Sequence, residues 1–225
     1  VNDTLQGPIK FNGKLPSLGQ DGQDVKVLAY PLIESEALFT PVTKGKEISL
    51  KSEKPHIVRS LILYPIKAGS ATAEIAVQQD SKWITIDKYN LDRSNPAKNV
   101  GFDPLAPFVF SLPETSGSEF RITLSAEGFI GKAELSDIPR VEHYAEKSFM
   151  KMWQTPLPMW DAYMWRDQPT YNKANTLQKE QVRDISAFMK PDGTLVWDVP
   201  EGKWVVSFPT FVPTFYQYLV ETMFG

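Results

Sequence analysis

Two carboxylates and several aromatic rings share one stretch of this sequence. Asp161 and Asp167 stand beside Trp160 and Trp165. A pair of carboxylates flanking a cleft can hydrolyse a glycosidic bond, and aromatic faces in a binding site can stack against sugar rings. The more ordinary interpretation is a loop whose aromatic side chains anchor it to the rest of the fold. If the stretch binds a ligand, the residues expected to contact it are Trp160, Asp161, Tyr163 and Trp165.

Other catalytic chemistry finds little support. The sequence has no cysteine and two histidines, His56 and His143, which we interpret as structural or surface residues. It contains no His-Glu-x-x-His zinc motif, no Gly-x-Ser-x-Gly nucleophile turn and no glycine-rich phosphate loop. We therefore predict no catalytic residue. Calcium binding at an acidic turn such as Asp80 or Asp103 remains an alternative, because Ca²⁺ prefers carboxylate and carbonyl oxygens. The sequence has no EF-hand spacing.

The composition is that of a folded, weakly acidic protein. Hydrophobic residues make up 42% of the 225 positions, enough for a sizeable core. With 24 basic and 27 acidic residues, the net charge of −3 argues against a nucleic-acid partner. No apolar run reaches the roughly 18 residues of a membrane span. The polar start, Val1 to Thr4, lacks the apolar region of a signal peptide.

Short β-rich runs dominate residues 25–138. Phe120, Ile122 and Leu124 alternate with polar residues, the period of a strand with one buried face. A polar turn at 79–82 joins two such runs in the pattern of a hairpin. Since no helical period separates the runs, we predict an all-β fold, an antiparallel β-sandwich or jelly roll. The expected strands are 25–30, 47–51, 57–66, 73–78, 83–86, 108–112, 120–124 and 130–135.

The two ends of the chain have a different character. Residues 1–24 are rich in Gly, Asn, Asp and Gln and are predicted to form an arm. Apolar spacing predicts a helix over 140–152, and the turn residues 200–202 between two β-rich runs predict a hairpin. The apolar tail 208–225 should pack on the sandwich or meet another domain. The expected domains are an arm at 1–24, a sandwich at 25–138, and a helix, aromatic loop and C-terminal hairpin at 139–225 that pack on the sandwich.

Two parts of the sequence resemble known proteins. The run 73–80 with Trp83 resembles the strand, acidic turn and Trp of galactose-binding-like (discoidin-type) sandwiches, and 120–135 resembles the last strands of that fold. The stretch 182–204 carries the pattern Trp-x-x-Pro-x-Gly-x-Trp at Trp197, Pro200, Gly202 and Trp204. It is similar to a hairpin of large bacterial glycoside hydrolases of the α-L-rhamnosidase type, family 106.

The resemblance implies the β-sandwich region of such an enzyme in an extracytoplasmic location, periplasmic or at the cell surface. In that family the hydrolytic carboxylates belong to a (β/α)₈ barrel, which this chain is too short and too β-rich to contain. No catalytic residue carries over, and Trp197 and Trp204 are expected to be hairpin core. The sequence departs from the family at 207–211, where an Arg-Phe-Gly-containing strand is replaced, so no active-site role is assigned to this end.

Three hypotheses about function follow. The leading one is a non-catalytic carbohydrate-associated module of a glycoside hydrolase, whose partner is carbohydrate or a neighbouring catalytic domain. The second is a purely structural sandwich packed on such a domain, which the apolar tail favours. The third is a free-standing hydrolase with Asp161 and Asp167 as the acid–base pair, which requires both carboxylates in one pocket about 5–10 Å apart.

Overall fold

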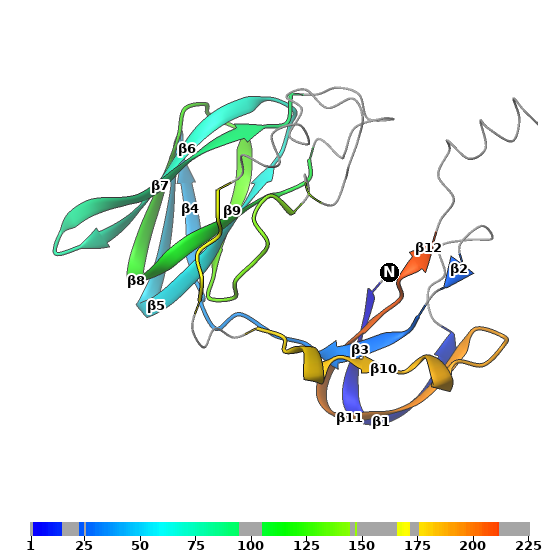
Figure 1. Cartoon of the computed structure of the whole chain (residues 1–225). Helices are drawn as coiled ribbons and strands as arrows, with labels where there is room; N and C mark the ends of the chain where they lie inside the picture. Colours follow the sequence, from blue (N-terminus) through cyan, green and yellow to red (C-terminus); the bar gives the residue numbers. More distant parts are fainter. Residues whose placement is uncertain are drawn as a thin grey trace, which may run out of the picture. The chain divides into compact units, whose positions relative to one another are not determined.

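The structure is a computed structural model that describes residues 2–14, 23–24, 26–94, 105–144, 147, 166–171 and 176–211. The chain divides into two compact units (Figure 1). The smaller unit combines Val1–Ile33 with Leu177–Gly225, and the larger unit is Glu34–Thr176. These boundaries differ from the predicted divisions at 24 and 138, because the two ends of the chain pair with each other.

The larger unit is an antiparallel β-sandwich, which confirms the predicted fold class (Figure 1). Its strands follow the order β4-β5-β8-β6-β7, and β9 pairs with β5. The strands are β4 (Thr40–Lys44), β5 (Glu47–Pro65), β6 (Ser70–Gln79), β7 (Lys82–Asp92), β8 (Phe108–Leu124) and β9 (Ile130–Ser136). β5 and β8 are each longer than predicted, since 47–51 and all but the last residue of 57–66 belong to one strand, as do 108–112 and 120–124.

The core of the larger unit follows the predicted alternation. Phe120, Ile122 and Leu124 of β8 point inward and are at most 3% exposed. The predicted hairpin is also present, since β6 and β7 pair across the turn at Asp80 and Ser81, whose φ angles are positive. Burial of such large apolar side chains stabilises the fold by about 1.5–3 kcal/mol each.

The smaller unit is a four-stranded antiparallel sheet with the order β1-β11-β3-β10, and β2 pairs separately with β12. Its elements are β1 (Asn2–Lys14), β2 (Gln23–Asp24), β3 (Leu28–Pro31), η2 (Lys179–Gln181), β10 (Arg183–Asp184), η3 (Ser186–Phe188), β11 (Thr194–Ser207) and β12 (Thr210–Phe211). Trp197 and Trp204 pack edge to face at 5.7 Å between ring centroids. Both are buried, as expected for core residues.

Two sequence-based predictions are wrong in the smaller unit. Much of the predicted arm is the 13-residue strand β1, and the predicted hairpin at 200–202 is a bulge inside the single strand β11. The pairs Gly7–Gly202 and Ile9–Val199 leave two β11 residues opposite one β1 residue. Proline and glycine suit a bulge as well as a turn, so the local signal pointed to the wrong element.

Two other predictions concern the chain after residue 139. Most of the predicted helix 140–152 lies outside the described residues, and within the described part of the C-terminal third only the short turns η2 and η3 are helical elements. Phe208, the first residue of the apolar tail, is 4% exposed and belongs to the core of the smaller unit. Residues 212–225 lie outside the described part, so packing of the C-terminal segment on the sandwich stays a prediction.

Asp184 ties β10 to the start of β3 through an exposed ion pair. Its carboxylate accepts hydrogen bonds from Lys26 Nζ at 2.8 Å and from Ser186 Oγ at 2.6 Å. The Lys26 ammonium, followed by Ser186, holds the pKa of Asp184 well below its ordinary value. A lowered folded-state pKa adds stability that is complete above about pH 4 and is lost as pH falls through the folded pKa.

We therefore expect Asp184→Asn to lower the melting temperature at neutral pH, and we expect the difference from the unchanged protein to shrink below about pH 4. The effect should be small and weaker in high salt, because both partners of the pair are exposed. Thermal melts of both proteins between pH 2.5 and pH 7 measure it. A difference in melting temperature that stays constant across this range would contradict the role of the carboxylate charge.

Candidate functional site

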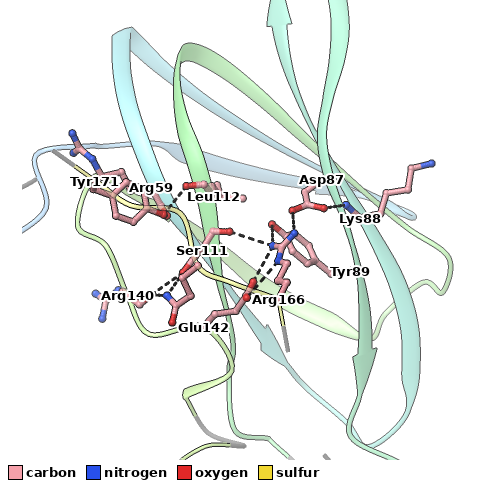
Figure 2. A network of polar contacts seen from close by, with 11 residues as sticks. Arg59, Asp87, Lys88, Tyr89, Ser111, Leu112, Arg140, Glu142, Arg166 and Tyr171 are labelled. Atoms are coloured by element: carbon pink, nitrogen blue, oxygen red, sulfur yellow. Dashed lines mark hydrogen bonds and ion pairs between the residues drawn. The ribbon is translucent and has the colours of Figure 1, made fainter. Parts of the chain in front are cut away.

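The four predicted ligand-binding residues, Trp160, Asp161, Tyr163 and Trp165, lie outside the described residues. The chain is described on both sides of them, however. The segment before them follows β9, and the segment after them is 166–171. Side chains from both segments meet on β7 and β8 of the sandwich in one polar network (Figure 2).

Arg166 is the centre of this network (Figure 2). Its guanidinium donates to Glu142 Oε1 at 2.9 Å and forms a short ion pair with Asp87 of β7. It also lies 5.3 Å from the ring centroid of Tyr89 and donates to the Ser111 carbonyl at 3.4 Å. These contacts raise the pKa of Arg166, above all through the hydrogen bond that its guanidinium donates to Glu142. Residues on both sides of the aromatic stretch are thus joined to each other and to the sandwich.

The Glu142 side chain is 2% exposed, whereas that of Arg166 is 46% exposed. A buried carboxylate is costly without a charged or hydrogen-bonding partner, so Arg166 stabilises the position of Glu142. The Arg166 guanidinium lies over the ring of Tyr89, which in turn stacks on Phe110 with ring centroids 3.9 Å apart. Burial raises the pKa of the Tyr89 phenol, so the hydroxyl stays protonated at neutral pH.

Two further side chains hold the segment after the aromatic stretch. Gln168 Nε2 donates to Ser111 Oγ at 2.7 Å and to the Arg140 carbonyl at 3.1 Å. The Tyr171 hydroxyl lies 2.6 Å from the Leu112 carbonyl, within hydrogen-bonding distance. Each of these bonds contributes about 1 kcal/mol. They fix residues 166–171 along β8 independently of the ion pairs.

The network offers no acid–base pair. Asp87 and Glu142 both accept hydrogen bonds from the Arg166 guanidinium, so both carboxylates are engaged in a structural contact. Asp167 is exposed, and its proposed partner Asp161 lies outside the described residues. No local sequence pattern predicts the network, because its key contacts join residues 24 and 79 positions apart.

The remaining candidates of the sequence analysis are dispersed. His143 places its ring edge-on against Phe110 at 5.4 Å, which is a packing contact. Asp80 occupies the tight β6–β7 turn, and Asp103 lies outside the described residues. Across the described ranges, no three His, Asp or Glu side chains gather as a metal site would require. Among the residues that the structure describes, no helical segment has the length and apolar character of a membrane span.

The larger unit also has a groove whose lining includes His56. It has a volume of about 940 Å³ and lies between residues 36–40, which lead into β4, and residues 51–56 of β5. Glu36 lies at one side of it and Glu53 at the other. Sequence reasoning missed this groove, because the groove depends on an irregularity in the pairing of β5.

Comparison with known proteins places the chain in a family. The family model described as alpha-L-rhamnosidase, glycoside hydrolase family 106, matches residues 4–208. This chain belongs to that family. The resemblance found in the sequence is thereby confirmed, and the match includes both structural units of this family 106 chain. Among curated proteins, none matches it.

A solved structure that aligns with most of the chain supports the fold. A rhamnosidase from Novosphingobium sp. PP1Y aligns with 92% of the family 106 chain at 20% identity and a TM-score of 0.59. At that identity the likeness shows a common fold, and the chain spans 22% of the length of that protein. A CBM32-3 module from a Clostridium perfringens family 31 glycoside hydrolase aligns with 52% of this chain and 86% of its own, at 12% identity and a TM-score of 0.28.

Proposed function

We propose that this chain is a non-catalytic, sugar-binding β-sandwich region of a family 106 glycoside hydrolase. The observation that carries the proposal is the family match over residues 4–208 in a chain whose described residues lie mostly in antiparallel strands. Those residues hold no (β/α)₈ barrel, the element that supplies the hydrolytic carboxylates in the family according to the sequence resemblance. Extracytoplasmic placement and a neighbouring catalytic domain belong to the same proposal.

Sugar binding is proposed at Trp160, Asp161, Tyr163 and Trp165. The three rings offer stacking surfaces, and the carboxylate accepts hydrogen bonds from hydroxyl groups. Support comes from the network around Arg166, which attaches the described chain on both sides of these residues to one place on the sandwich. Anchored ends reduce the entropy that must be lost when a loop binds a ligand. A Kd in the millimolar range fits a small polar ligand.

The proposal is tested by titrating the protein with rhamnose, galactose and oligosaccharides and following tryptophan fluorescence and binding heat, with and without Ca²⁺. We expect saturable binding of one sugar class, and at least a tenfold loss of affinity in Trp160→Ala and Trp165→Ala. Trp83→Ala is the matched control, because Trp83 is a partly exposed tryptophan of β7 that packs against Arg121. Binding that survives both substitutions would remove the site from these residues.

A structural role is the second candidate. All five residues of the edge strand β4 are exposed, and Val42 and the nearby Leu38 are 59% and 76% exposed. Exposed edges with apolar side chains are commonly covered by a partner. A flat response to every sugar would favour this role over sugar binding.

A further inference from the structure

The groove between residues 36–40 and 51–56 is formed by a break in the regular pairing of β5. Four residues of that strand, 52–55, lie opposite the single residue Ser118 of β8, whereas the pairing is regular over the neighbouring residues 47–51 and 56–58. Leu50 and Val58 flank the break and are both fully buried. A bulge changes the direction of the side chains it carries, and bulges are concentrated next to binding sites. The bulge turns residues 52–54 toward the groove.

Both walls of the groove are attached to the sandwich. Phe39 contributes an apolar surface to the groove. Its half-buried ring is held by contacts with His56 and the core residue Phe120, at 5.6 Å and 5.4 Å between ring centroids. Asp137 holds the segment just before it, accepting hydrogen bonds from Ser35 Oγ at 2.5 Å and from the backbone N–H of Glu36 at 3.1 Å. The groove is therefore preformed, as small-molecule sites usually are.

The charged side chains of the groove balance in sign, and most of them are available to bind a ligand. Its lining includes two acidic residues, Glu36 and Glu53, and two basic residues, Lys51 and Lys54. Lys51 pairs with a glutamate outside the lining. In the part of the chain that the structure describes, the side chains of Glu36, Glu53, Lys54 and His56 make no hydrogen bond or ion pair. Hydroxyl groups both donate and accept, so they can pair with all four, whereas a strongly charged ligand of either sign meets a like charge.

We propose that this groove binds a short neutral oligosaccharide through residues other than those of the aromatic stretch. Phe39 and Leu38 offer the apolar surface, and Glu53, Lys54 and His56 bind the hydroxyl groups. The volume of about 940 Å³ is at the upper end of small-ligand sites, which suits several linked sugar rings better than one. The class of ligand rests on the proposed carbohydrate function, but the location rests on the groove alone.

The test compares two double variants of the full chain that leave the net charge unchanged. Glu53→Ala with Lys54→Ala removes two exposed groove side chains, and Lys179→Ala with Glu180→Ala removes an exposed pair in the smaller unit. Calorimetric titrations use cello-, xylo-, manno- and galactotetraose, with a sulfated oligosaccharide as the charged probe. We expect about tenfold weaker binding of a neutral tetraose to the groove variant and unchanged binding to the control variant.

A third variant, Trp160→Ala with Trp165→Ala, separates the two sites. If the groove variant loses binding and this third variant retains it, the groove proposal stands and the aromatic stretch is not the site. If only the third variant loses binding, the groove proposal is overturned while the proposed function stands. Preference for the sulfated probe, or equal affinity in the groove and control variants, also overturns the groove proposal. No binding by the unchanged protein overturns both.

Discussion

Replacing Gly7 with alanine should destabilise the smaller unit by about 3 kcal/mol or more, because there is no room for a side chain at this point of β1. A Cβ atom there would lie 1.8 Å from the Pro200 carbonyl oxygen and 2.9 Å from that of Val199. Both obstacles are backbone atoms of β11, so no rotation of a side chain can relieve the overlap. β1 and β11 would therefore have to move apart at the bulge in their pairing.

The matched control is Gly13→Ala, on the same strand. The Cβ atom there would meet only the ring of Phe11, at 3.0 Å, and a side chain can shift by that amount. Hydrogen exchange distinguishes the outcomes, since Gly7→Ala should speed exchange of the β11 amides while the β8 amides of the larger unit keep their protection. Equal protection of β11 in the two variants would contradict the close approach.

The same strand shows why part of the fold could not be predicted. β1 contains glycine, asparagine and proline, which by propensity argue against a strand. It forms because it pairs along β11, and Leu5 and Phe11 pack against the core of the smaller unit. Those contacts join the two ends of the chain, and no local window of sequence contains them. In the larger unit, by contrast, alternation in β8 and the β6–β7 turn were local signals and predicted their elements correctly.

The candidate site divides in the same way. The cluster of aromatic residues and carboxylates near residue 160 can be recognised from the sequence alone, and these residues remain the proposed sugar contacts. The Arg166 network was not visible, because an isolated Glu, Arg or Asp in a sequence is most often a solvated side chain. Burial of Glu142 at 2% exposure distinguishes it from such residues, and burial is a property of the folded chain. The bulge in β5 was hidden for a similar reason, since 52–55 contains a proline and charges typical of a loop.

Replacing Arg166 with leucine should have the second large effect, a loss of about 2–3 kcal/mol from the stability of the larger unit. Glu142 would remain buried without the guanidinium that now donates to it, and an unpaired buried charge costs more than the pair contributes. The expected loss of stability is smaller than for breaking a fully buried ion pair, because the Arg166 side chain is 46% exposed. Urea unfolding measures it. Arg140→Leu is the control, since the Arg140 side chain is exposed and only its carbonyl belongs to the network.

A double-mutant cycle with Glu142→Gln separates the ion pair from other losses. If the pair is the cause, Arg166→Leu should cost much less stability in the Glu142→Gln background, because a neutral amide needs no counter-charge. Additive losses would contradict the pairing. The sugar titration then connects stability to function: under conditions where the Arg166→Leu variant is still folded, its affinity should fall while that of Arg140→Leu does not. Rescue by Arg166→Lys should be partial, since lysine restores the charge but not the fork that reaches Glu142 and Asp87 together.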